Sequence, residues 1–127
     1  GALLGLARAQ STQGKTKEAL ANLQALLKAH PKSNEAAAAQ FQLGFLEGSN
    51  AVRKYDKAVA AMQKVWTDFP RSELAAPALW HAAFYRASQN RYADGLPLLE
   101  KLQREYAKDK RAPYTAQWIA IFQARSK

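Results

Sequence analysis

Apolar residues recur at intervals of three and four along most of the chain, which is the spacing of one face of an α-helix. The clearest case is the segment from Thr16 to His30. Its apolar positions are Ala19, Leu20, Leu23, Leu26 and Leu27. No segment alternates apolar and polar residues for long enough to form a strand. The pattern therefore predicts an all-α chain.

Turn and helix-breaking residues divide this pattern into seven helices. We expect them at about residues 2–12, 16–30, 33–47, 55–69, 72–88, 92–106 and 113–123. Ser33 and Ser72 are the expected N-caps of the third and fifth helices, because a serine hydroxyl can accept a bond from a free amide N–H of the first turn. Pro77 suits the first turn of a helix. Pro97 should kink its helix, unless that helix begins later.

One segment of the sequence occurs twice. PKSNEAAAAQFQLGF begins at Pro31, and PRSELAAPALWHAAF begins 39 residues later at Pro70. A period of this size indicates stacked helical repeats. Such arrays usually hold another molecule on an extended surface.

Small residues recur at matching places in each predicted hairpin, where they would let two helices approach closely. The positions in the first helices are Ala7, Gly44 and Ala83, and those in the second helices are Ala19, Ala58 and Gly95. Larger apolar residues flank each of them and would fill the remaining space.

This arrangement resembles the tetratricopeptide repeat, a helix-turn-helix unit with a Leu-Gly pair, an alanine, two further apolar positions and a closing proline. The second copy carries Leu43-Gly44, Ala58, Met62, Val65 and Pro70 at these positions. The third copy has Ala107 where the proline should stand, and the turn at 48–54 is enlarged. The stretched unit is similar to bacterial cell-envelope members of the family, such as the periplasmic Tol–Pal-associated coordinator and the lipoprotein that scaffolds outer-membrane protein assembly. That similarity favours the periplasm or cell envelope, with the cytoplasm as the alternative.

The resemblance implies a right-handed α-α superhelix of three hairpins followed by a C-terminal helix. The repeats would cover about residues 1–32, 33–71 and 72–108, with the last helix at about 113–124. We expect one domain, and we interpret the apolar start at Gly1 as that of a fragment or processed form of a longer protein.

In the tetratricopeptide family the first helix of each hairpin lines a concave groove. The resemblance places three pairs of residues on that face, namely Leu4 and Arg8, Phe41 and Phe45, and Trp80 and Phe84. Members of each pair are four residues apart and share one stripe. The four aromatic residues are either anchors for a bound peptide or core residues that fill the space between hairpins.

The resemblance implies that the chain is a protein–protein interaction module. Two other functions fit the sequence. Nineteen Lys and Arg against ten Asp and Glu give a net charge of +9, which suits a surface that binds anionic lipid or nucleic acid. Alternatively, the array is a structural spacer that oligomerises through its last helix. The basic residues are scattered over several turns, which makes nucleic acid the weaker prediction.

The sequence offers little for catalysis. It has no cysteine, and His30 and His81 have no companion at ligand spacing, so we expect no metal site. No Gly-rich phosphate loop or nucleophile motif is present. We therefore expect neither enzymatic activity nor a cofactor.

Overall fold

The computed structural model describes residues 16–30, 35–49 and 52–126 of the chain. Within these ranges the chain forms six helices and no strand: α2 (Thr16–Ala29), α3 (Ala36–Glu47), α4 (Tyr55–Asp68), α5 (Ala75–Ser88), α6 (Tyr92–Glu105) and α7 (Ala112–Arg125). The prediction of an all-α fold is confirmed. The helix expected at 2–12 and the cap expected at Ser33 lie outside the described residues.

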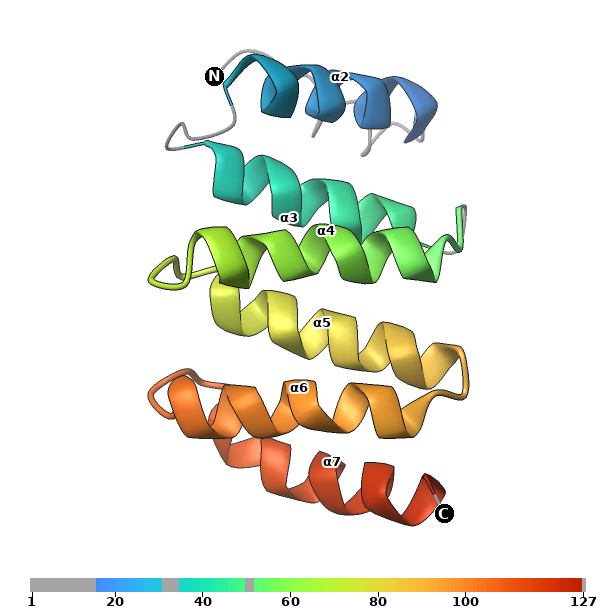
Figure 1. Ribbon diagram of the computed structural model, residues 1–127, viewed down its shortest axis with the longest axis vertical. Coiled ribbons are helices and arrows are strands. Elements are labelled where there is room, and N and C mark those ends of the chain that lie inside the picture. Colours follow the sequence, from blue (N-terminus) through green and yellow to red (C-terminus); the bar gives the residue numbers. More distant parts are fainter. Residues whose placement is uncertain (1–15, 31–34, 50–51, 127) are drawn as a thin grey trace.

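The helices follow one another along the long axis of the molecule in chain order, and the turns between them alternate between its two sides (Figure 1). Each helix packs mainly against the next one in the chain. In the repeat pattern α3, α5 and α7 are first helices, whereas α2, α4 and α6 are second helices. Aromatic contacts also join the successive first helices α3, α5 and α7 directly.

Small residues bring the two helices of each hairpin into close contact. A Cβ atom added to Gly44 of α3 would lie 3.1 Å from the carbonyl oxygen of Ala58 in α4. A Cβ atom added to Gly95 of α6 would lie 2.9 Å from the carbonyl oxygen of Ala83 in α5. In both hairpins the small residue of the first helix therefore meets the small residue of the second helix. The glycine is in the first helix of one hairpin, α3, and in the second helix of the other, α6. The close approach predicted from the sequence is confirmed here.

A large aromatic residue of α5 and of α7 packs against the preceding hairpin, near the turn that joins the two helices of that hairpin. The Tyr85 ring of α5 lies so close to Gly48 that a Cβ atom there would be 2.5 Å from it, and its centroid is 6.0 Å from that of Tyr55. Phe122 of α7 occupies the corresponding place in the next unit, in contact with Gly95 and 5.3 Å from the ring of Tyr92. Consecutive hairpins are therefore joined by the same type of aromatic contact.

The turn between α3 and α4 is longer than the turn between α5 and α6, as the sequence predicted. Its base is closed by a hydrogen bond from the Lys54 N–H to the Glu47 carbonyl oxygen at 2.7 Å. Arg53 adopts a φ of 54°, a left-handed conformation that turns the chain back toward the array. The shorter turn uses Asn90 in the same way, with a φ of 59°.

Two expectations about helix starts need correction. Ser72 is not the N-cap of α5, because the helix begins at Ala75 and Leu74 is the N-cap residue. The Ser72 hydroxyl instead accepts the Leu74 N–H at 3.1 Å, within a turn that leads into the helix. The later start considered for the helix with Pro97 is also wrong. The helix α6 begins at Tyr92 and continues through Pro97, where no amide N–H is available for the carbonyl of Ala93.

We expect Gly95→Ala to destabilise the fold. The added methyl group would meet the Phe122 ring at 2.8 Å and a backbone oxygen at 2.9 Å, and overpacking of this kind costs about 1–3 kcal/mol. The better helix propensity of alanine returns only about 1 kcal/mol. Urea unfolding measures the net loss. Gly44→Ala is the matched control, because its closest contacts are 3.1 Å and its loss should be smaller. An equal or greater loss for Gly44→Ala would contradict this account of the packing.

Candidate peptide-binding face

The first helices α3, α5 and α7 form one face of the array, which we call the first-helix face. Aromatic side chains connect these helices in the same way at each junction. Phe41 and Phe45 of α3 both contact His81 of α5 edge-on, with ring centroids 5.6 and 5.7 Å apart. Phe84 of α5 contacts Trp118 of α7 edge-on at 4.9 Å. His81 and Trp118 occupy equivalent positions of their helices, so the joint repeats.

The predicted site residues occupy different environments. Leu4 and Arg8 lie outside the described residues. Phe41, Trp80 and Phe84 are half-buried and pack against the cores of the array. Phe45 is 45% exposed. Phe84 in particular is covered by Trp118 and by Phe122, whose ring is 5.7 Å away.

These residues therefore differ in how much surface they leave to solvent. Phe84 fills space between α5 and α7, whereas Phe45 keeps a large apolar surface exposed. Phe41 and Trp80 are intermediate in exposure.

Two aromatic residues of α7 on this face were not among the site residues predicted from the sequence. Tyr114 is 58% exposed, the largest value among the exposed large apolar residues of the described chain, and Trp118 is half-buried. These residues are four apart and share one stripe of α7. The register that placed the other pairs corresponds in α7 to Gln117 and Ile121, so it does not point to Tyr114 and Trp118.

A pocket of about 370 Å³ opens between α5 and α7. Its aromatic walls are Trp80, Tyr114 and Trp118, and its basic side is formed by Lys110 and Arg111 in the turn before α7. The pocket therefore combines large ring surfaces with positive charge, a combination that can hold an apolar group and a carboxylate at the same time.

His81 lies beside this pocket and is shielded from solvent by aromatic neighbours. Its ring contacts Phe41 and Phe45, and it stacks on Tyr85 at 6.2 Å. Burial lowers the pKa of His81 from its usual value, and the positive charge of Arg111 lowers that pKa further. The imidazole is therefore neutral at pH 7 and acts as a ring surface.

The basic residues at the α3–α4 turn form a separate surface. Arg53, Lys54 and Lys57 line a shallow pocket of about 330 Å³ together with Asp56. Asp56 accepts hydrogen bonds from Gln89 at 3.0 Å and Arg86 at 2.8 Å, which lower the pKa of its carboxyl group. In Figure 1 this turn and the α6–α7 turn lie on opposite sides of the array. The described basic groups therefore do not form one continuous stripe.

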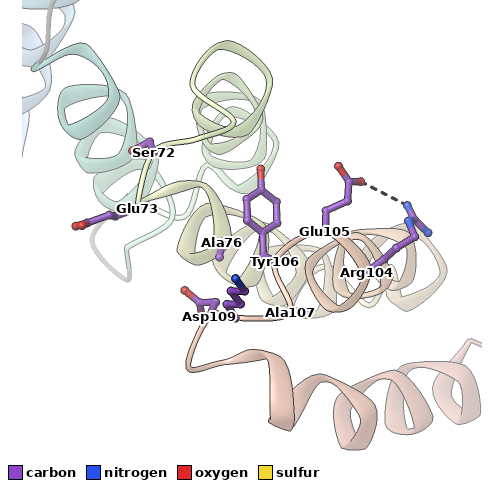
Figure 2. A pocket seen from close by; sticks show the side chains of 9 residues that line it. Ser72, Glu73, Ala76, Arg104, Glu105, Tyr106, Ala107 and Asp109 are labelled. Carbon is purple, nitrogen blue, oxygen red and sulfur yellow. Dashed lines mark ion pairs between the residues drawn. The ribbon is translucent and has the colours of Figure 1, made fainter.

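A third pocket, of about 420 Å³, lies between the turn that leads into α5 and the C-terminal end of α6 (Figure 2). Its polar lining carries both signs of charge, from Glu73, Arg104, Glu105, Lys108 and Asp109. The Tyr106 hydroxyl donates a hydrogen bond to the carbonyl oxygen of Pro70 at 2.8 Å and ties the two turns together. This pocket is best explained as the gap at the open end of the third hairpin, where the start of α5 lies beside the end of α6.

The described part of the chain contains no group of three or more His, Cys, Asp or Glu side chains that could hold a metal ion. None of the described helices combines the length and the apolar character that a bilayer-spanning helix needs.

The tetratricopeptide repeat family model matches residues 1–33 and 36–72, which is more than half of the chain. The chain belongs to the tetratricopeptide repeat family. No curated protein matches its sequence. The hairpin of α5 and α6 lies beyond the two matched segments and continues the same packing. Tetratricopeptide repeats generally mediate protein–protein interactions, and the family is typically a non-enzymatic scaffold.

The environment of His81 leads to a pH prediction. Because its pKa in the folded protein lies below the usual 6.5, the unfolded chain binds this proton more readily. Its contribution to stability is therefore complete above about pH 6.5 and is lost as the pH falls through the lower, folded-state value. We expect the urea midpoint to fall between pH 7.5 and pH 5.5, and to fall less in His81→Phe. An equal fall in both proteins would show that this histidine does not titrate as described.

Proposed function

We propose that the chain binds a segment of another protein along the first-helix face, as an adaptor or assembly module. The observation that carries this proposal is the exposure of an aromatic side chain on two of the first helices, α3 and α7. Phe45 of α3 and Tyr114 of α7 remain 45% and 58% exposed, although they neighbour well-packed aromatic clusters. Exposed rings with rigid support are favourable anchors, because little side-chain entropy is lost when a partner covers them.

The half-buried rings support the exposed ones. Phe41 and Phe45 of α3 both contact His81 of α5, and the ring centroids of Trp80 and Phe84 are 5.0 Å apart within α5. A bound segment would therefore meet a surface that is already ordered. The family's general role in protein–protein interaction supports the same function.

The cellular setting is part of the proposal. The similarity of the stretched repeat units to cell-envelope members of the family supports a partner in the periplasm or cell envelope. The net charge of +9 would speed encounter with an acidic partner surface, since steering by charge acts mainly on the association rate.

The experiment is a selection of binders from a library of random peptides displayed on phage, followed by titration of the synthetic peptides. We expect Phe45→Ala to weaken binding by about tenfold or more, as truncation of an aromatic anchor residue does. Gln63→Ala is the control, because Gln63 is an exposed residue of α4 and belongs to a second helix. Its variant should bind like the wild type.

Other outcomes would favour the rival functions. If charge reversals abolished binding while Phe45→Ala had no effect, a basic surface for anionic lipid or nucleic acid would replace the proposal. If no peptide bound, the first-helix face would have no role in recognising extended segments.

A second candidate function, self-association through α7, is favoured by a specific observation. Aligned on the first residue of each helix, Ala116 and Ala120 of α7 correspond to Gln40 and Gly44 of α3 and to Leu79 and Ala83 of α5. The residues in α3 and α5 are buried, whereas both alanines of α7 are exposed. The side of α7 that would face a second helix therefore presents small residues, which allow close approach of another helix.

If copies pair through this side of α7, the mass measured by sedimentation equilibrium should rise with protein concentration. Ala120→Glu should keep the protein monomeric at every concentration, because the pair would have to bury two unpaired carboxylates. Ala93→Glu, at an exposed alanine of α6, is the matched control and should associate like the wild type. A wild-type mass that stays monomeric would rule out this candidate.

A further inference from the structure

The pocket between α5 and α7 has a shape and composition that the rest of the first-helix face lacks. Three aromatic side chains, Trp80, Tyr114 and Trp118, stand around a volume of about 370 Å³. Pockets that hold whole small molecules usually measure about 300–1,000 Å³, so this one is near the lower limit. It is suited to a single large side chain, and its ring walls favour an apolar or aromatic one.

The charge at the rim of this pocket is positive. Lys110 is exposed and has no ion-pair partner among the residues that the structure describes. The Arg111 guanidinium lies 3.6 Å from a carboxylate oxygen of Asp109, which also accepts the Arg111 N–H at 2.9 Å. Asp109 therefore offsets the charge of Arg111 alone, and the rim retains the positive charge of Lys110.

The positive charge at the rim determines which kind of charged group the pocket favours. Three rings around a small volume could also form a cage for an ammonium group, but the two cations at the rim would repel it. A carboxylate beside an aromatic group satisfies both the rings and the charge. Arg111, which is 26% exposed, can offer a bidentate contact, and Lys110 adds a mobile point charge.

The pocket and the exposed ring of Phe45 are linked through neighbouring residues of α5. Phe45 contacts His81, which adjoins Trp80 in α5, and Arg111 is close enough for its charge to lower the pKa of His81. A bound chain can therefore run from α3 across α5 and pass through the pocket without ending there. This favours an internal carboxylate over a chain terminus as the charged partner.

We propose that this pocket binds an aromatic side chain of an extended protein segment in which an acidic residue neighbours the aromatic one. The ring lies between Trp80 and Trp118, Tyr114 covers it from the solvent side, and the carboxylate meets Lys110 and Arg111. The inference rests on the proposed function and names the sequence chemistry that the first-helix face selects.

The test uses blocked synthetic peptides and the full chain. Gly-Asp-Phe-Asp-Gly, acetylated and amidated at its ends, is titrated while the indole N–H resonances of the three tryptophans are recorded by NMR. We expect the resonances of Trp80 and Trp118 to shift. The resonance of Trp66, which is only 7% exposed, should stay in place as an internal reference. Replacing both aspartates of the peptide by asparagine should weaken binding by about fivefold or more. Raising the salt concentration should weaken the acidic peptide alone.

Variants of the protein test whether the acidic peptide binds at this pocket. Tyr114→Ala removes an exposed ring and should weaken the acidic peptide without unfolding the protein. Lys110→Glu should abolish the preference for the acidic peptide over its asparagine form. Lys64→Glu changes the net charge equally at an exposed position of α4 and should leave that preference intact. If Lys64→Glu and Lys110→Glu had equal effects, the preference would belong to the overall charge and the proposal would fail.

Two further outcomes separate this inference from the proposed function. If Gly-Gly-Asn-Phe with a free C-terminal carboxylate bound and the blocked acidic peptide did not, the pocket would hold a chain terminus and the inference would be overturned. If selected peptides bound through Phe45 but were insensitive to Lys110→Glu and Tyr114→Ala, the proposed function would stand and only this inference would fall. If neither class of peptide bound, both would fail.

Discussion

The close contact between the two helices of each hairpin is the constraint on which the rest of the array depends. Gly44 against Ala58, and Ala83 against Gly95, bring backbone within reach of backbone. A helix held at that distance lets the next first helix extend a large ring across to the previous hairpin, as Phe122 does over Gly95. The stacking of hairpins, and with it the first-helix face, follows from two pairs of small residues.

Much of this architecture could be predicted from the sequence because local residue patterns determine it. Prolines, glycines and apolar spacing placed the helices that the structure describes, and the repeat placed the small residues. The start of α5 was misplaced because the Ser72 hydroxyl bonds within a turn before the helix, which local pattern does not distinguish from a cap. The pocket of Trp80, Tyr114 and Trp118 was missed because it arises from the way α7 packs on α5, a contact that no single segment encodes.

The half-buried aromatic residues of the first-helix face combine a structural role with the role that we propose for them in binding. The rings of Phe41, Phe84 and Trp118 hold successive first helices together, and the same ring clusters support the exposed edges that a partner would cover. A partner that binds there would stabilise the folded array by an amount set by its affinity and concentration. Substitutions at the half-buried rings would change stability and binding together, whereas Phe45 and Tyr114 report on binding more directly because they are largely exposed.

The long turn between α3 and α4 is a place where extra residues can be inserted without disturbing the helices. The hydrogen bond between the Lys54 N–H and the Glu47 carbonyl oxygen closes the base of the turn, so extra residues leave the array and return to the same place. Doubling the length of such a closed loop costs only about 0.6 kcal/mol of entropy. Insertions can therefore accumulate at this edge without moving α4 relative to α3. The α3–α4 turn can therefore vary in sequence and length while the packing register of α3 and α4 stays constant.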